Sequence, residues 1–164
     1  MIILGIDPGL MHTGWAVVDS ANNSFKFIAA GVIKTAASDQ SSYRLLKISQ
    51  ELEVIIQAYF PIAAAIEETY VNKNYGSSLK LAHARSAAIL TLAQNGLHPA
   101  EYPAKTIKKT IVGTGRAEKD QVAKILHMII SGVPQLTNDA SDALAIAVCH
   151  GLLTTARNRQ LLTF

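Results

Sequence analysis

The chain has 164 residues, of which 49% are hydrophobic and 16% charged, and its formal net charge is +3. This length suits one domain with its own core, and the composition excludes an intrinsically disordered chain. No apolar run approaches the roughly 20 residues that span a bilayer, and the start of the chain lacks the basic region of a signal peptide, so we expect a cytoplasmic protein. The single cysteine, Cys149, excludes a disulfide framework and a Cys-based zinc site.

The first half of the chain is predicted to open with a β meander. Strand-like segments, rich in Ile, Val and aromatic residues, cover residues 1–7, 13–19 and 25–34. Apolar residues at helical spacing then predict a helix over residues 45–59, which Pro61 closes.

The second half alternates strands with helices. Strands are predicted over residues 62–71 and 98–102, and helices over residues 77–95, 103–112, 117–131 and from 138 past 148. Helical crossovers should place the fourth and fifth strands parallel to the first. The pattern predicts an α/β fold with a five-stranded mixed sheet covered by helices on both faces. We expect one domain over residues 1–152, followed by a C-terminal tail over residues 153–164.

Acidic side chains end two strands that are predicted to run parallel. Asp7 closes the first strand, a position where an aspartate alone is more often a turn residue than a ligand. Glu67 and Glu68 lie towards the end of the fourth strand. Ligands of open α/β sheets bind at the carboxyl ends of strands, so one of these acids should lie within reach of Asp7. Successive strand residues face opposite sides, and the apolar pattern does not decide which glutamate shares the face of Asp7.

Two further acids lie at the start of the last predicted helix. Asp139 and Asp142 are three residues apart, so they sit side by side on a helix and border its apolar stripe. An acid in the first turn of a helix also complements the helix dipole, which explains either residue alone without a ligand.

The four acids together indicate a site for hard cations. Carboxylate oxygens are preferred ligands of Mg²⁺ and Mn²⁺, and mutually repelling acids are stable together only with cations between them. Two such ions, roughly 3.5–4 Å apart, can clamp the attacking and leaving oxygens of a phosphodiester displacement. These residues therefore predict a metal-dependent phosphodiesterase.

Six of the 15 basic residues lie close together in the sequence: Lys105, Lys108, Lys109, Arg116, Lys119 and Lys124. The cluster fits a polyanionic partner, although a solvated surface is the commoner explanation for such a run.

Nine short motifs follow one another along most of the chain. They are Gly5–Gly9, Thr13–Gly14, Ala65–Glu67, Lys73–Asn74, Leu79–Leu81, Ala84–Arg85, Val112–Gly113, Ala117–Lys119 and Asp139–Ala147. The first motif alone also opens actin-like ATPases and other ribonuclease-H-like proteins. In its full order and spacing, the set resembles the RuvC family of Holliday-junction resolvases.

The resemblance implies an RNase H-like fold, a homodimer, and Mg²⁺-dependent hydrolysis, with Mn²⁺ able to substitute, that nicks four-way DNA junctions symmetrically in recombination and repair. It implies two ions per active site when substrate is bound. It assigns the metal ligands to Asp7, Glu67, Asp139 and Asp142, which selects Glu67 over Glu68, and it assigns catalytic lysines to Lys108 and Lys119. We expect the Ala- and Leu-rich helix over residues 77–95 to form the dimer contact.

The resemblance also implies contacts with partners. Tyr70 matches an aromatic residue that stacks on an unpaired base, an interaction worth about 1–3 kcal/mol, although a half-buried strand aromatic explains it equally well. Further DNA contacts are expected at Lys73, Asn74, Lys80, Arg85, Lys105, Lys109 and Arg116. A branch-migration motor complex of the RuvA and RuvB type is the implied protein partner. Ser86 stands where the family has glycine.

Two other functions are compatible with these residues. The first is a module that binds branched DNA without cutting it, against which the presence of all four acids counts. The second is a related RNase H-like nuclease that acts on an RNA-containing substrate. Tyr70 and the two lysines at family positions favour cleavage of a DNA junction over both.

Overall fold

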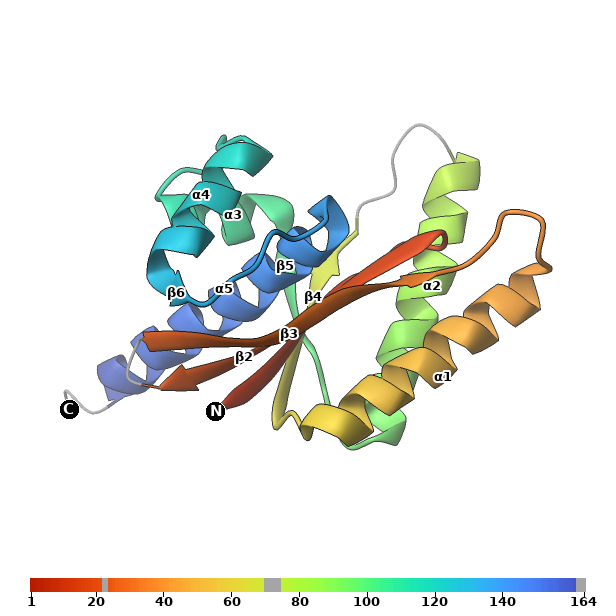
Figure 1. Cartoon of the computed structure of the whole chain (residues 1–164), viewed down its shortest axis with the longest axis horizontal. Coiled ribbons are helices and arrows are strands. Elements are labelled where there is room, and N and C mark those ends of the chain that lie inside the picture. The colour runs from red at the N-terminus through yellow and green to blue at the C-terminus, as the bar shows by residue number, and fades with distance from the viewer. Residues whose placement is uncertain (22–23, 70–74, 162–164) are drawn as a thin grey trace.

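Helices cover both faces of a single sheet in the computed structural model (Figure 1). It describes residues 1–21, 24–69 and 75–161, with residues 157–161 described by their backbone alone. The strands are β1 (Ile2–Asp7), β2 (His12–Ala21), β3 (Ser24–Lys34), β4 (Ala63–Glu68), β5 (Ala100–Pro103) and β6 (Ile130–Ser131). The helices are α1 (Ser41–Tyr59), α2 (Tyr75–Gln94), α3 (Ala104–Val112), α4 (Lys119–Ile129) and α5 (Asn138–Leu161).

Within these ranges the strands form one sheet in the order β5-β4-β1-β2-β3-β6. Strands β1, β2 and β3 pair antiparallel, β4 is parallel to β1, and β5 is parallel to β4. These pairings confirm the predicted meander and the predicted parallel placement of the fourth and fifth strands. The carboxyl ends of β1 and β4 therefore meet at one edge of the sheet.

The described sheet has one strand more than the five that the sequence predicts. Strand β6 runs parallel to β3, with the pairs Phe25↔Ile130 and Lys26↔Ser131. These residues fall inside the helix predicted over 117–131, because α4 ends at Ile129 and the chain passes directly into the strand. A two-residue strand is too short to show an alternation of period two, so the sequence pattern cannot separate it from the helix.

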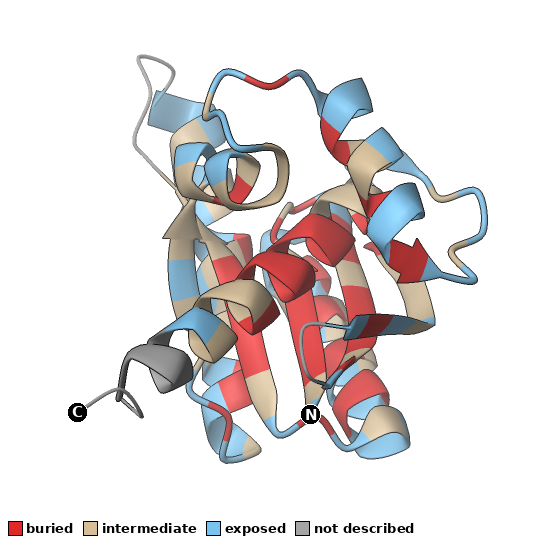
Figure 2. Ribbon diagram, turned by 90° about the vertical axis from the view of Figure 1, so that its left-hand side faces the viewer, coloured by how far each residue is buried: buried red, intermediate tan, exposed pale blue. Residues whose placement is uncertain are grey.

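Each face of the sheet packs against its own group of helices. On one face, Ile3 of β1 packs in a buried cluster with residues of α3, α4 and α5, such as Leu126 and Leu144. On the other face, Leu4 and Ile6 pack with residues of α1 and α2. Figure 2 shows the buried residues concentrated in the central strands and in the part of α5 that crosses them. The predicted coverage of both faces is confirmed.

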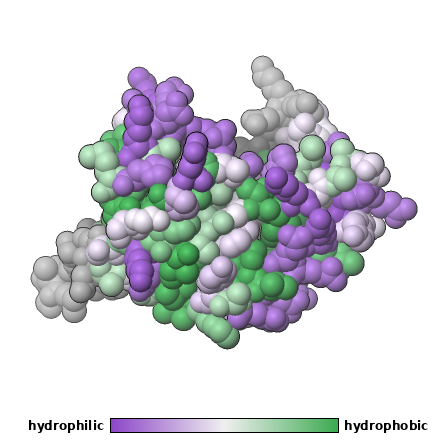
Figure 3. Space-filling view, in the orientation of Figure 1, coloured by the Kyte–Doolittle hydropathy of each residue, from purple (hydrophilic) through white to green (hydrophobic). Residues whose placement is uncertain are grey.

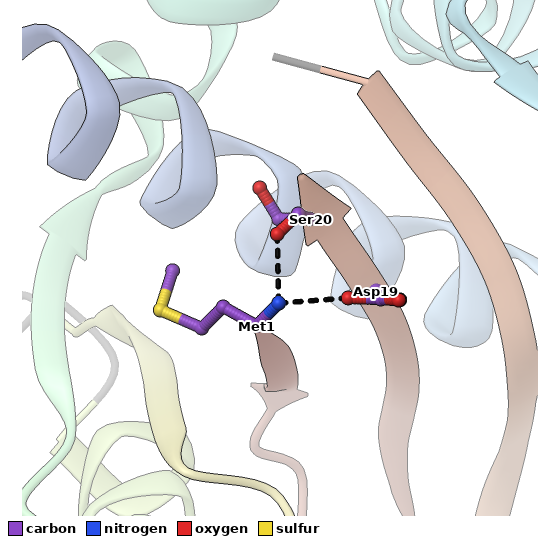
Figure 4. A network of polar contacts seen from close by, with 3 residues as sticks. All are labelled: Met1, Asp19 and Ser20. Carbon is purple, nitrogen blue, oxygen red and sulfur yellow. Dashed lines mark hydrogen bonds and ion pairs between the residues drawn. The ribbon is translucent and has the colours of Figure 1, made fainter. Parts of the chain in front are cut away.

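The start of β1 is held on β2 by polar contacts (Figure 4). The amino group of Met1 donates to Asp19 Oδ1 and to the Ser20 carbonyl, each at 2.8 Å, and the Ser20 N–H donates back to the Met1 carbonyl at 2.9 Å. The antiparallel register then runs from Ile2↔Asp19 to Asp7↔Gly14 without a bulge. The position of Asp7 at the far end of the strand follows from this register.

Helix α5 lies directly on the sheet backbone at two glycines. A Cβ atom at Gly14 would lie 2.0 Å from the Asp139 carbonyl oxygen, and one at Gly5 would lie 2.2 Å from the Ala143 carbonyl oxygen. A Cβ atom cannot lie this close to a carbonyl oxygen, so only glycine permits α5 to approach the strands here. The approach brings the first turn of α5 over the end of β1, next to Asp7.

Helix α5 also extends further than expected. It runs to Leu161, so residues 153–161 of the predicted tail continue the helix, and the proposed boundary at residue 152 falls inside it. Within the described ranges, no helix combines the length and the apolar character needed to cross a membrane.

Candidate active site

Asp7 and Glu67 end neighbouring parallel strands on the same face of the sheet. The pairing Ile6↔Ile66 makes Asp7 and Glu67 the next residues on the two strands. Ala65, two residues before Glu67, packs in the cluster beneath α5, whereas Ile66 packs against α1 and α2. Because side chains alternate along a strand, Glu67 points to the α5 face and Glu68 to the opposite one. The packing thus identifies Glu67, and not Glu68, as the glutamate on the same face as Asp7, which the apolar pattern did not decide.

A pocket of about 230 Å³ joins three of the four predicted acids. Asp7 comes from β1, Glu67 from β4, and Asp142 from α5, and the remaining lining residues are Ala104, Ile107, Lys108, Lys119, Val122 and Ala145. Asp139 lies one turn before Asp142 and does not line the pocket, but its charge contributes to raising the pKa of Asp7. The structure therefore brings both predicted lysines to the predicted acids.

The acids occupy a poorly solvated, negatively charged environment. The pKa of Asp7 is raised from 3.8 to about 7, chiefly by burial and then by the charges of Glu67 and Asp142, while Lys119 partly opposes the rise. Burial also raises the pKa of Glu67, and Asp142 adds to that rise. A cluster of this kind is stabilised by positive charge in the pocket, whether a proton, an ammonium group or a cation.

Lys119 supplies one such positive charge. Its ammonium group forms an ion pair and hydrogen bond with Asp142, and this hydrogen bond raises the pKa of Lys119. Lys119 is the first residue of α4, whose start is fixed by a hydrogen bond of 3.0 Å from the Glu118 N–H to Gln121 Oε1. Lys108 reaches the same pocket from α3, so each lysine is presented by its own helix.

The chemistry of the donor set fits a hard divalent cation. All four predicted ligands are carboxylates, the oxygen donors that Mg²⁺ and Mn²⁺ prefer. As the side chains stand, with Lys119 bonded to Asp142, no three acidic, histidine or cysteine side chains of the described residues converge closely enough to hold an ion.

Other predicted basic residues surround the pocket. Lys105 and Lys109 are exposed on α3, and Arg116 is exposed on the loop before α4. Gly115 packs over the Lys105 side chain, since a Cβ there would lie 2.5 Å from Lys105 Cγ. In Figure 3, hydrophilic side chains gather over α3 and α4. The basic cluster of the sequence is therefore a surface of these two helices beside the pocket.

The predicted DNA contacts on α2 divide into two kinds. Lys80 is exposed, as a DNA contact requires. Arg85 instead forms an ion pair with Glu101 of β5, and its Nε donates to the Glu67 carbonyl at 3.4 Å. Arg85 thus ties α2 to the strand end that carries Glu67, a positioning contact between residues far apart in sequence that no motif indicated. The predicted contacts Tyr70, Lys73 and Asn74 lie outside the described residues.

The chain matches known proteins in family, sequence and structure. The family model described as "Crossover junction endodeoxyribonuclease RuvC" matches residues 3–150. The RuvC of Gluconobacter oxydans is 47% identical over 148 residues, which cover 90% of this chain and 88% of the relative. The RuvC of Paramagnetospirillum magneticum is 43% identical over 150 residues, which cover 92% and 90%.

Solved structures agree with the sequence matches. The structure of Thermus thermophilus RuvC in complex with a Holliday junction substrate superimposes with a TM-score of 0.89 at 26% identity, covering 96% of each chain. A second Thermus thermophilus RuvC structure gives 0.86 at 25% identity, covering 96% of this chain and 97% of the other. The RNase H-like α/β fold implied by the resemblance is confirmed.

Proposed function

Because the chain belongs to the RuvC family of crossover junction endodeoxyribonucleases, we propose that it resolves four-way (Holliday) DNA junctions by paired, symmetric, metal-dependent nicks. The observation that carries this proposal is the single pocket that unites Asp7, Glu67 and Asp142 with Lys108 and Lys119. Acids that can hold cations and ammonium groups that can bind phosphate are the two requirements of phosphodiester hydrolysis. Recombination and DNA repair are the processes that need this reaction.

Four carboxylates, Asp7, Glu67, Asp139 and Asp142, would hold Mg²⁺ or Mn²⁺, with two ions when DNA is bound. The ions would lower the pKa of the attacking water and neutralise the charge that develops on the leaving 3′ oxygen. The strand ends and the first turn of α5 orient these carboxylates, and the close contact at Gly14 keeps α5 in place. Burial of Asp7 and Glu67 keeps bulk water from weakening their attraction for cations.

Lys119 and Lys108 would stabilise the phosphate as its negative charge increases in the transition state. Lys119 is paired with Asp142, and a cation at Asp142 would release the ammonium group towards the phosphate. The exposed residues Lys105, Lys109 and Arg116 would bind neighbouring phosphates of the same DNA. Tyr70, Lys73 and Asn74 remain proposed DNA contacts on the grounds of resemblance.

A homodimer would supply two active sites related by the two-fold symmetry of the junction. An apolar groove between α1 and α2 supports α2 as the dimer contact. It is lined by Leu45, Leu46, Ser49, His83, Ser86, Ala87 and Leu90, and two of its leucines are largely exposed. Exposed apolar surface of this kind is typical of subunit contacts. The branch-migration motor complex and the cytoplasmic location remain proposals that rest on resemblance.

The function is tested by nicking of a synthetic four-way DNA junction. We expect cleavage with Mg²⁺ or Mn²⁺ and none in EDTA, and we expect Asp7→Asn and Glu67→Gln to lower the rate about 100-fold or more. Glu68→Gln is the matched control, since the same change one residue later faces away from the pocket and should leave the rate unchanged.

Three outcomes would contradict the proposal. Junction binding in EDTA without cleavage on adding metal would indicate a binding module. Faster cleavage of an RNA–DNA hybrid than of the junction would indicate a different substrate. A Glu68→Gln variant as impaired as Glu67→Gln would show that the pocket is not the active site.

A further inference from the structure

A second pocket, of about 270 Å³, lies across the sheet from the active site. It is bounded by the turn between β1 and β2, by the start of α1, and by the first turns of α2. Among the described residues, its polar lining consists of Arg44, Ser77 and Lys80, without an acidic side chain. Figure 1 shows the β1–β2 turn lying beside α2. The part of the pocket that the described residues form is therefore positively charged and contains no acidic counter-charge.

Arg44 is the unusual residue of this pocket because it is buried without an acidic partner. Only 6% of it is exposed, and its one side-chain hydrogen bond to a described residue runs from Nε to Thr35 Oγ1 at 2.9 Å. Among the described residues, no ion pair involves Arg44, and no fully buried side-chain nitrogen lacks a hydrogen-bond partner. The terminal guanidinium nitrogens must therefore be accessible to solvent. They are accessible through the pocket that Arg44 lines.

Burial of an unpaired charge is costly, so the guanidinium is expected to meet an anion there. Two neighbouring features strengthen the positive potential. Lys80 is exposed at the same pocket, one turn into α2. The first turn of α2 contains no acidic residue, so its dipole also favours a negative charge. An arginine fork and a lysine beside a helix start are suited to a phosphate group.

The pocket is linked to the active site through the turn that follows Asp7. Thr35 Oγ1, which accepts the hydrogen bond from Arg44, donates to the Leu10 carbonyl at 2.5 Å, and the Thr35 N–H donates to the Met11 carbonyl at 3.0 Å. Leu10 and Met11 line the pocket three and four residues after Asp7. Thr35 therefore connects Arg44 to the turn that directly follows Asp7.

We propose that Arg44 and Lys80 bind one backbone phosphate of the DNA at a position that is not cleaved. The ligand is a phosphodiester anion, and the proposal rests on the function proposed above. Arg44 would hold the phosphate and, through Thr35, the turn that follows Asp7. A free phosphate ion has similar chemistry, so the test must separate the two sources.

The test measures binding to a synthetic four-way DNA junction in EDTA, where no cleavage occurs. We expect Arg44→Gln and Lys80→Ala each to weaken binding roughly tenfold and to reduce the slope of log Kd against log salt concentration by up to about 1. Lys26→Ala is the matched control, because Lys26 is an exposed lysine at the opposite end of β3. Because Arg44 and Lys80 would bind the same phosphate, the double variant should lose less binding free energy than the two single variants added together.

Junctions that carry a single neutral methylphosphonate linkage locate the phosphate. At one position of the junction, the neutral linkage should weaken binding by the wild-type protein about tenfold. At the same position it should not weaken binding by Arg44→Gln any further. Where Arg44→Gln fails to fold, the same comparison with Lys80→Ala decides, since that side chain is exposed.

The proposal is overturned if both variants bind as tightly as Lys26→Ala, or if no linkage behaves in this way. The free phosphate ion is tested by comparing the melting temperature of the protein in phosphate and in chloride buffer at equal ionic strength. A phosphate-specific stabilisation with no responsive linkage would assign the pocket to a free anion and overturn the DNA assignment. Nicking by the wild-type protein is measured separately, so failure here is distinguishable from failure of the proposed function.

Discussion

At the scale of single residues, Asp7 determines how the metal-free protein responds to pH. Its pKa is raised to about 7 because the carboxylate is buried beside Glu67 and Asp142. A group whose pKa is higher in the folded than in the unfolded state stabilises the fold below its unfolded pKa, here 3.8, and loses that contribution as the pH rises to about 7. Asp7, which the proposed reaction would use as a metal ligand, therefore destabilises the metal-free fold at neutral pH.

Asp7→Asn should consequently stabilise the metal-free protein. We expect the free energy of unfolding to rise by about 4 kcal/mol at pH 8 and to be unchanged near pH 3, because asparagine mimics the protonated carboxyl. Urea unfolding in EDTA at the two pH values measures the effect. A variant that is less stable than wild type at pH 8 would show that the carboxylate is favourably solvated.

Lys119 allows a second test at this scale. Its ammonium group is largely exposed and contacts Asp142, so Lys119→Ala should lower the nicking rate about 10- to 100-fold with little effect on stability. Lys124→Ala, an exposed lysine further along α4, provides the control. Equal rates for the two variants would remove Lys119 from the proposed mechanism.

At the scale of elements, the decisive contact is the one between α5 and the sheet. The helix carries two of the four acids but can reach the strand ends only because Gly5 and Gly14 have no side chains. Asp142 is in this way placed across from Asp7 by backbone packing. Stability and catalysis are coupled at these glycines.

Gly14→Ala should therefore damage both properties. A methyl group 2.0 Å from the Asp139 carbonyl must push α5 away, which should cost about 1–3 kcal/mol and lower the nicking rate of the folded protein at least tenfold. Gly31→Ala is the control, since its methyl group would meet Trp15 at 2.8 Å on the face covered by α1. It should cost stability without slowing the folded enzyme, as urea unfolding and nicking kinetics would show together.

At the scale of the whole molecule, the proposed paired nicking would require two copies of the chain to act together. The apolar groove of α1 and α2 lies on the sheet face opposite the active-site pocket. A dimer formed there would leave both pockets open to DNA. Breaking the dimer should therefore uncouple the two nicks without altering the chemistry of either site.

Leu90→Glu is the variant that tests the dimer. Leu90 is 60% exposed and lines the groove, so a buried charge there should shift the protein towards monomers and abolish paired nicking. Val54→Glu, at a 64% exposed position on α1 outside the groove, should remain dimeric. Analytical ultracentrifugation measures the oligomeric state. If Leu90→Glu and Val54→Glu show the same proportions of monomer and dimer, this groove is excluded as the dimer contact.

Local patterns were sufficient for most elements of the fold. Strand and helix periods depend on neighbouring residues, and connection lengths constrain which strands are parallel, so β1 to β5 and the flanking helices could be predicted. The strand β6 and the extension of α5 to Leu161 could not. Two residues have no period, and the apolar pattern weakens towards the end of α5 although the helix continues.

The sequence by itself determined the chemical inventory: four acids, two lysines and their order along the chain. Only the tertiary structure decided which of them meet. Strand alternation is the same for both faces of a sheet, so Glu67 differs from Glu68 only because α5 packs on one face. The ion pair of Lys119 with Asp142 and the unpaired charge of Arg44 likewise depend on contacts between distant segments. Such contacts arise when the whole core closes, and no local pattern encodes them.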